Sequence, residues 1–236
     1  RRWGVRRDAA LLGGIFFAFS SFNLLHFMHL NVVAIAAHLP FKWLAIDFAL
    51  RARERHTLPI ACVCLALLTS SQLLLGHPQI VWISLLAEGS YALLLAWALG
   101  CLRRLPLLVA TQGVAFALAA IQLLPQWESL AASRRSGSGA DFAFSLALHP
   151  VNLNQFVAPL LFADRTIGDA EATEFSLYCG ALAPVLLAWL WIRRRDLAAP
   201  RGGVVAALCG AGVALLLAAL GLFGLRRDVV DRVHDA

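Results

Sequence analysis

The chain has 236 residues, of which 60% are hydrophobic and 14% are charged, and its formal net charge is +6. This composition, with a mean hydropathy of +0.74, excludes an ordinary soluble domain and predicts a membrane protein in contact with membrane lipid. The positive charge does not indicate a nucleic-acid partner, because the arginines stand at the ends of apolar runs and not along one soluble face.

Seven apolar runs follow one another along the chain, each about long enough for one helical crossing of a bilayer. They comprise residues 8–25, 32–50, 58–75, 80–99, 105–124, 177–192 and 203–225. Pro40 interrupts the second run, and Pro184 is expected to bend the sixth. The sequence therefore predicts an all-α polytopic transmembrane helical bundle of about seven spans.

The junctions between the runs alternate in character. One set is rich in arginine and comprises residues 1–7, 51–55, 103–104 and 193–195. The other set holds histidine, asparagine, glutamine and glutamate, in residues 26–31, 76–79 and 125–176. Because basic loops stay in the cytoplasm, the second set is expected to be extracytoplasmic. Three arginines near the C-terminal end (Arg226, Arg227 and Arg232) oppose this assignment and leave the topology of the last span open.

Residues 125–176 form the longest stretch between two predicted spans, and this stretch is too long for a simple connector. Within it, residues 146–162 are semi-apolar and contain two prolines, which favours an interfacial or re-entrant helix. We interpret residues 1–236 as a single transmembrane domain, expected to be a fragment of a longer protein, with 125–176 as its long extracytoplasmic loop.

Three blocks of residues carry a resemblance to a known family. The first is Ala-Leu-Leu-Gly-Gly-Ile-Phe-Phe-Ala-Phe-Ser-Ser, ending at Ser21 and continued by His29-Leu-Asn31 and Leu39-Pro40. The second is Gln72-Leu-Leu-Leu-Gly-His-Pro-Gln79. The third comprises Gln122-Leu-Leu-Pro-Gln-Trp-Glu128, Pro150-Val-Asn-Leu-Asn154, Pro159-Leu-Leu-Phe162 and Glu174-Phe-Ser-Leu-Tyr-Cys-Gly180. Together they resemble the YfhO-like family of bacterial membrane proteins, which are polytopic glycosyltransferases of the GT-C type.

The resemblance implies a GT-C-like membrane fold in the bacterial inner (cell) membrane. It also implies a polyprenyl-phosphate-linked sugar donor, an envelope glycan or lipid as acceptor, and transfer at the extracytoplasmic face. In GT-C enzymes the catalytic carboxylate usually lies on the first extracytoplasmic loop. Residues 26–31, the first such loop here, contain no acid, so the resemblance implies that this chain starts after the catalytic loop. The catalytic residues are therefore unknown.

Two acids outside the spans are candidates for catalysis. Glu128 follows the fifth span beside Trp127, and Glu174 stands just before the sixth. Either carboxylate could act as a general acid or base. The alternative is a solvated loop acid near the belt of interfacial aromatic residues.

Six residues with imidazole or amide side chains are candidates for substrate binding: His29, Asn31, His77, Gln79, Asn152 and Gln155. Imidazole and amide groups can bind sugar hydroxyls or phosphate oxygens, since an amide donates and accepts at once. The alternatives are helix capping and anchoring at the membrane interface. His26, His29 and His38 raise the question of a divalent metal, but no acid or further histidine accompanies them at helical spacing, so no cofactor is expected.

Charged residues inside the spans point to a rival interpretation. Lys42 and Asp47 lie in the second span, where their side chains could extend to the membrane surface or form an ion pair. Glu88 lies in the middle of the fourth span. Buried charge at that depth is costly and is typical of transporters. The alternative function is thus a non-enzymatic membrane protein: a transporter, a flippase or an assembly scaffold.

Overall fold

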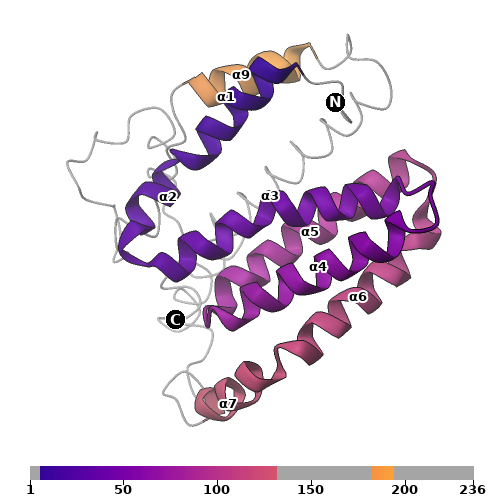
Figure 1. The fold of residues 1–236 in the computed structure, drawn as a ribbon. Coiled ribbons are helices and arrows are strands. Elements are labelled where there is room, and N and C mark those ends of the chain that lie inside the picture. Colours follow the sequence, from indigo (N-terminus) through magenta and orange to yellow (C-terminus); the bar gives the residue numbers. More distant parts are fainter. Residues whose placement is uncertain (1–5, 132–181, 194–236) are drawn as a thin grey trace, which may run out of the picture. The chain divides into compact units, whose positions relative to one another are not determined.

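The computed structural model describes residues 6–131 and 182–193, and every regular element within these ranges is a helix. In chain order they are α1 (Arg7–Ala18), α2 (Ser21–Leu25), the 3-10 helix η1 (His26–Met28), α3 (Leu30–Leu50), α4 (Thr57–Leu74), α5 (Pro78–Ala98), the 3-10 helix η2 (Leu102–Arg104), α6 (Leu105–Leu118), α7 (Ala120–Ala131) and α9 (Leu182–Ile192) (Figure 1). The predicted all-helical fold is confirmed for these residues. They belong to two compact units, one with residues 6–28 and 182–193 and the other with residues 29–131.

In the first unit, the first predicted span is bent. The chain bends by 45° between α1 and the segment Phe22–Met28. Near the bend, the Ser20 hydroxyl and the Asn23 amide both donate hydrogen bonds to the Phe17 carbonyl oxygen, at 3.0 and 2.7 Å. Side-chain bonds of this kind compete with the helical ladder, which explains why one straight helix does not continue beyond Ala18. Of the predicted sixth span, the structure describes the part that forms α9.

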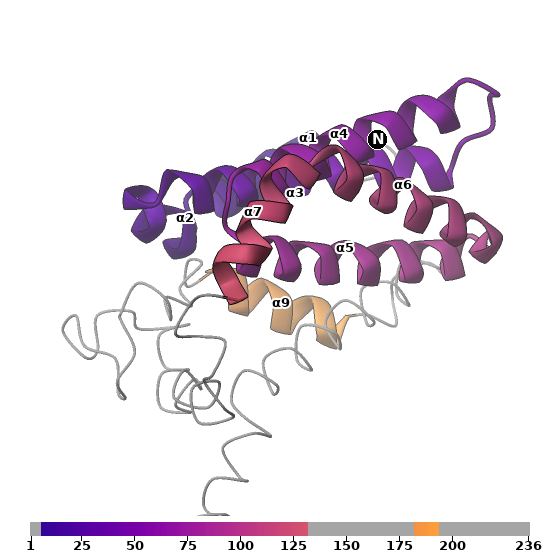
Figure 2. The ribbon, with the colours of Figure 1, turned by 90° about the horizontal axis from the view of Figure 1, so that it is seen from below.

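The second unit is a helical bundle in which α3, α4, α5 and α6 alternate in direction along the chain (Figure 1). Helix α3 packs against α4 and α5, and α4 packs against α6 (Figures 1 and 2). Helices α3, α4 and α5 begin and end within two residues of the predicted spans. Pro40 lies inside α3 without ending it. Many of the residues buried at the helix contacts are alanine, including Ala45, Ala49, Ala92 and Ala96, and such small side chains let helices approach closely in a membrane.

The two ends of this bundle differ in chemistry. The arginine-rich links between α3 and α4 and between α5 and α6 lie at one end, whereas His29, the α4–α5 turn and α7 lie at the other (Figure 1). At the first end, the Arg104 guanidinium donates to the carbonyl oxygens of Ala49, Leu50 and Ala52 at 2.9–3.0 Å. These carbonyls belong to the last turn of α3 and the residues after it, where helices leave acceptors without an internal partner. One arginine therefore caps α3 and ties it to the α5–α6 link.

The fifth predicted span is broken in two. Helix α6 ends at Leu118, α7 begins at Ala120, and the chain bends by 72° between the two segments. Helix α7 carries polar residues at Gln122, Gln126 and Glu128 between apolar ones, a pattern typical of a helix at a membrane interface. The stretch that we predicted as a loop from residue 125 onward therefore begins inside a helix.

The bundle encloses several polar side chains in its interior and is apolar outside. Ile60, Trp97 and Val109 are exposed by more than 60%, whereas Lys42 and Glu88 are almost completely buried. This arrangement is typical of helices surrounded by lipid, where apolar side chains face outward and polar ones pack inward. By length and composition, three described helices can cross a membrane, or up to five if each bent pair counts as one span. The seventh predicted span, residues 203–225, lies outside the described residues.

Candidate functional site

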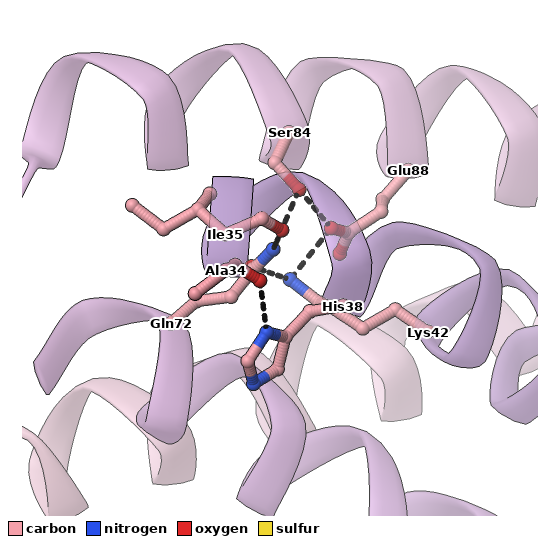
Figure 3. A network of polar contacts seen from close by, with 7 residues as sticks. All are labelled: Ala34, Ile35, His38, Lys42, Gln72, Ser84 and Glu88. Atoms are coloured by element: carbon pink, nitrogen blue, oxygen red, sulfur yellow. Dashed lines mark hydrogen bonds and ion pairs between the residues drawn. The ribbon is translucent and has the colours of Figure 1, made fainter. Parts of the chain in front are cut away.

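A network of buried polar side chains connects α3, α4 and α5 (Figure 3). Lys42 Nζ lies 2.6 Å from Glu88 Oε1 and donates to Gln72 Oε1, also at 2.6 Å. Gln72 Nε2 donates to the Ile35 carbonyl at 2.8 Å and to Ser84 Oγ at 3.2 Å. Ser84 in turn donates to Glu88 Oε1 at 2.7 Å. The cation and the carboxylate thus neutralise each other inside the bundle.

A second polar contact lies beside the network. His38 Nδ1 donates to the Ala34 carbonyl at 2.6 Å, which leaves Nε2 of a neutral imidazole to accept from the Ser71 hydroxyl at 3.0 Å. His38 and Ser71 also line a groove of about 690 Å³ between α3 and α4, whose other lining side chains are mainly apolar. The groove is therefore lined by apolar side chains together with the hydrogen-bonded pair of His38 and Ser71.

The structure decides between the two roles expected for Lys42 and supplies the partner of Glu88. Lys42 does not extend to the membrane surface, because its side chain is completely buried and pairs with Glu88. Asp47 accepts from Nε of Arg51, the C-cap residue of α3, at 2.7 Å. Sequence reasoning missed Gln72 and Ser84 as members of the network. A signal for Ser84 was its position four residues before Glu88, which places both side chains on one face of α5.

At the end of the bundle opposite the arginine-rich links, the Gly76–Gln79 turn contacts α7. Gly76 adopts φ +75°, a backbone conformation that favours glycine, and Pro78 begins α5. Gln126 Nε2 donates to the Gly76 carbonyl at 3.2 Å. The structure therefore brings together two of the blocks that carry the family resemblance.

A cavity of about 540 Å³ lies next to this turn, between α4, α5, α6 and α7; we call it the rim cavity. Its lining includes Leu73, Trp82, Phe116, Leu123, Gln126 and Trp127. Most of these side chains are apolar or aromatic, and Gln126 adds an amide. Such a combination suits an elongated apolar molecule that carries a polar group at one end.

The candidate residues have different surroundings. His77 occupies the N-cap position of α5 without a capping side-chain bond, and its Nδ1 is buried with no hydrogen-bond partner among the described residues. Gln79 and Glu128 are exposed. His29 is exposed at the N-cap of α3, and Asn31 Oδ1 accepts from the Val32 N–H at 3.0 Å.

The candidates Asn152, Gln155 and Glu174 lie outside the described residues. Within the described ranges, no group of three His, Cys, Asp or Glu side chains is placed to hold a metal ion. His26, one of the histidines considered for a metal, donates from Nδ1 to the Phe22 carbonyl at 2.8 Å and stacks on the Phe22 ring. Comparisons with known protein families, curated proteins and solved structures find no match to this chain.

Proposed function

We propose that the chain is part of a membrane glycosyltransferase that transfers a sugar from a polyprenyl-phosphate donor to an envelope glycan or lipid at the extracytoplasmic face. The supporting observation is the rim cavity, which adjoins the Gly76–Gln79 turn and α7. The resemblance of both segments to the YfhO-like family led to the same assignment.

The rim cavity has the properties that a polyprenyl chain requires. Its volume of about 540 Å³ lies in the range of roughly 300–1,000 Å³ that is common for small-molecule sites. Trp82, Phe116 and Trp127 offer apolar surface to isoprenoid units. The helices around the cavity are apolar on their outer faces, so a lipid-linked donor can enter from the bilayer without leaving an apolar environment.

Polar residues that adjoin lining residues in the sequence are available for the phosphate and the sugar. His77 and Gln79 flank the lining residue Pro78, and Glu128 follows the lining residue Trp127 on α7. The imidazole and the amide can donate to phosphate oxygens or sugar hydroxyls, and the carboxylate can accept from a hydroxyl. The reaction would displace the polyprenyl phosphate at the anomeric carbon by an acceptor oxygen, with inversion.

Three substitutions in the full-length protein test this assignment: His77→Ala, Gln79→Ala and Glu128→Gln. Losing one hydrogen bond to a charged group costs about 1.5–3 kcal/mol, so transfer or donor binding should fall roughly tenfold to a hundredfold. Sugar transfer is measured with a labelled polyprenyl-phosphate sugar in membranes.

Arg53→Gln, at the arginine-rich end of the bundle, is the matched control and should leave the rate unchanged. Expression and detergent stability of all four variants should remain close to the wild-type values. Full activity in the three variants, or loss of activity only through misfolding, would contradict the proposal.

The chain of 236 residues by itself should not transfer sugar. Its first loop on the proposed extracytoplasmic side lacks the carboxylate that the family resemblance requires. Purified protein is assayed with the same donor, beside the full-length enzyme as a positive control. Transfer by the short chain would place the base within it, and Glu128 and Glu174 would be the first residues to replace.

The Lys42–Glu88 pair favours a second candidate function, ion-coupled transport. Transporters hold charged residues within the bundle and use them as coupling sites. Under this alternative, the full-length protein in liposomes would move a solute in response to an imposed ion gradient, and Glu88→Gln would abolish this movement. Sugar transfer by the wild type, with no solute movement by the same protein, would favour the glycosyltransferase.

A further inference from the structure

A second cavity, of about 220 Å³, lies between α5 and α6, and Ile46 of α3 and Leu65 of α4 complete its lining. We call it the α5–α6 cavity. It shares the lining residue Leu85 with the rim cavity, whose volume is about 540 Å³. The two cavities are therefore neighbours that meet at Leu85.

The residues that line the two cavities form one continuous stripe on each helix. On α5 the stripe comprises Trp82, Leu85, Gly89 and Leu93, and on α6 it comprises Val109, Gln112 and Phe116. Successive members are three or four residues apart, so they share one face of their helix. Both stripes pass from one cavity to the other. The rim cavity and the α5–α6 cavity are thus two parts of a single groove, which we call the α5–α6 groove.

The part of this groove beyond Leu85 offers an occupant mainly apolar surface. Leu93 and Val109 are exposed on the outer face of the bundle, so this part opens toward lipid. Its polar lining residues present little of their polar atoms. Glu88 is 2% exposed and is neutralised by Lys42, and the side-chain oxygen of Gln112 is buried. These properties suit a hydrocarbon chain that enters sideways from the bilayer.

The length and direction of the groove match those of a lipid tail. Its lining on α5 extends from Pro78 to Leu93, which at about 1.5 Å per residue is about 22 Å, or roughly three quarters of a 30 Å hydrocarbon core. Carbon–carbon bonds of about 1.5 Å give an extended isoprene unit a length of roughly 5 Å, so about four units fit. The groove begins beside His77 and Gln79 and runs from there into the apolar part of the bundle.

Building on the sugar transfer proposed above, we propose that the α5–α6 groove holds the tail of the polyprenyl-phosphate donor. The first isoprene units lie in the rim cavity, and the following units pass Leu85 into the α5–α6 cavity. Gly89 keeps this second part open, because it has no side chain to occupy the space. Acyl chains of the bilayer compete for the groove, but the donor tail is tethered to a phosphate bound at the rim, which raises its effective concentration there.

Photolabelling tests this path of the tail. Two long-chain polyprenyl phosphates carry a diazirine, one on the first and the other on the fourth isoprene unit, and each is photolysed with the full-length protein in detergent micelles. Mass spectrometry should locate the first-unit label in residues 78–82 or 123–127 and the fourth-unit label in residues 89–93 or 105–109. An excess of unlabelled polyprenyl phosphate should remove both labels.

The two probes separate this inference from the proposed function. If the first-unit probe labels the rim cavity and the fourth-unit probe labels only other segments, the path of the tail is refuted, whereas the donor site at the rim stands. If the first-unit probe does not label the rim cavity, the proposed function loses its donor site and this inference fails with it.

Two glycines provide a matched test of the groove beyond Leu85. Gly89 lines the α5–α6 cavity and Gly113 lines neither cavity, and a side chain added at either position meets no other atom within 4 Å. Gly89→Phe should lower the fourth-unit labelling of residues 89–93 and 105–109 roughly tenfold, because the displaced units lose their packing contacts. First-unit labelling of the rim cavity should persist, which shows that the variant is folded. Gly113→Phe should retain both labels, and equal fourth-unit yields in the two variants would refute the role of Gly89.

Discussion

Replacing Lys42 by methionine should destabilise the bundle strongly, since methionine has a similar length but no charge. In this variant Glu88 keeps, among the described residues, the Ser84 hydroxyl as its donor, and Gln72 Oε1 loses its charged donor. Removing one partner of a buried ion pair typically costs about 3–5 kcal/mol, because the remaining charge stays buried without compensation. Glu88→Leu should cost a similar amount, since it leaves the Lys42 ammonium buried with Gln72 as its remaining partner.

The double variant Lys42→Met/Glu88→Leu should be more stable than either single variant. Replacing a buried pair by apolar residues of similar volume is often close to neutral, because neither charge then has to be desolvated. The two substitutions should therefore be far from additive, as expected for residues in direct contact. Comparing the double variant with the two single variants separates the contribution of the ion pair to stability from the contribution of side-chain packing.

The free energy of unfolding is measured in mixed detergent micelles by tryptophan fluorescence. Glu54→Gln, in the exposed link between α3 and α4, is the control and should change stability by less than about 0.5 kcal/mol. If each single variant costs less than about 1 kcal/mol and the double variant is additive, Lys42 and Glu88 do not form a buried pair. The packing of α3 against α5 would then have to be revised.

Three further predictions follow from the ends of the bundle. A cysteine at Gln79 should react with an impermeant maleimide in intact cells, whereas one at Arg53 should react only after lysis; the reverse would overturn the proposed orientation. Gly76→Ala should lower the free energy of unfolding by about 1 kcal/mol, because alanine disfavours φ +75°. A neutral effect in the same fluorescence assay would exclude a positive φ at residue 76. Arg104→Gln should cost about 1–3 kcal/mol, because three carbonyl oxygens near the end of α3 lose the charged guanidinium donor. Arg103→Gln, at an exposed position, should be neutral, and equal effects of the two substitutions would refute the capping role.

The three long helices could be predicted from the sequence because their apolar runs have the length of a membrane crossing. Helices α3, α4 and α5 agree with the predicted spans within two residues. Hydropathy alone did not reveal the breaks near Phe19 and Ala119, since each run is apolar on both sides of its bend. The first break depends on hydrogen bonds from Ser20 and Asn23 to a single carbonyl, which a hydropathy profile does not contain.

The buried network could be predicted only in part. The sequence placed Lys42 and Glu88 inside apolar spans, where burying a charge is costly. No sequence pattern predicted that these two residues, 46 positions apart, form an ion pair with each other. Composition and the spacing of apolar residues determine that these segments form helices and that lipid surrounds them. The packing of α3 against α4 and α5 decides which polar groups meet, because a hydrogen bond or ion pair forms only where atoms from different helices come within about 3 Å.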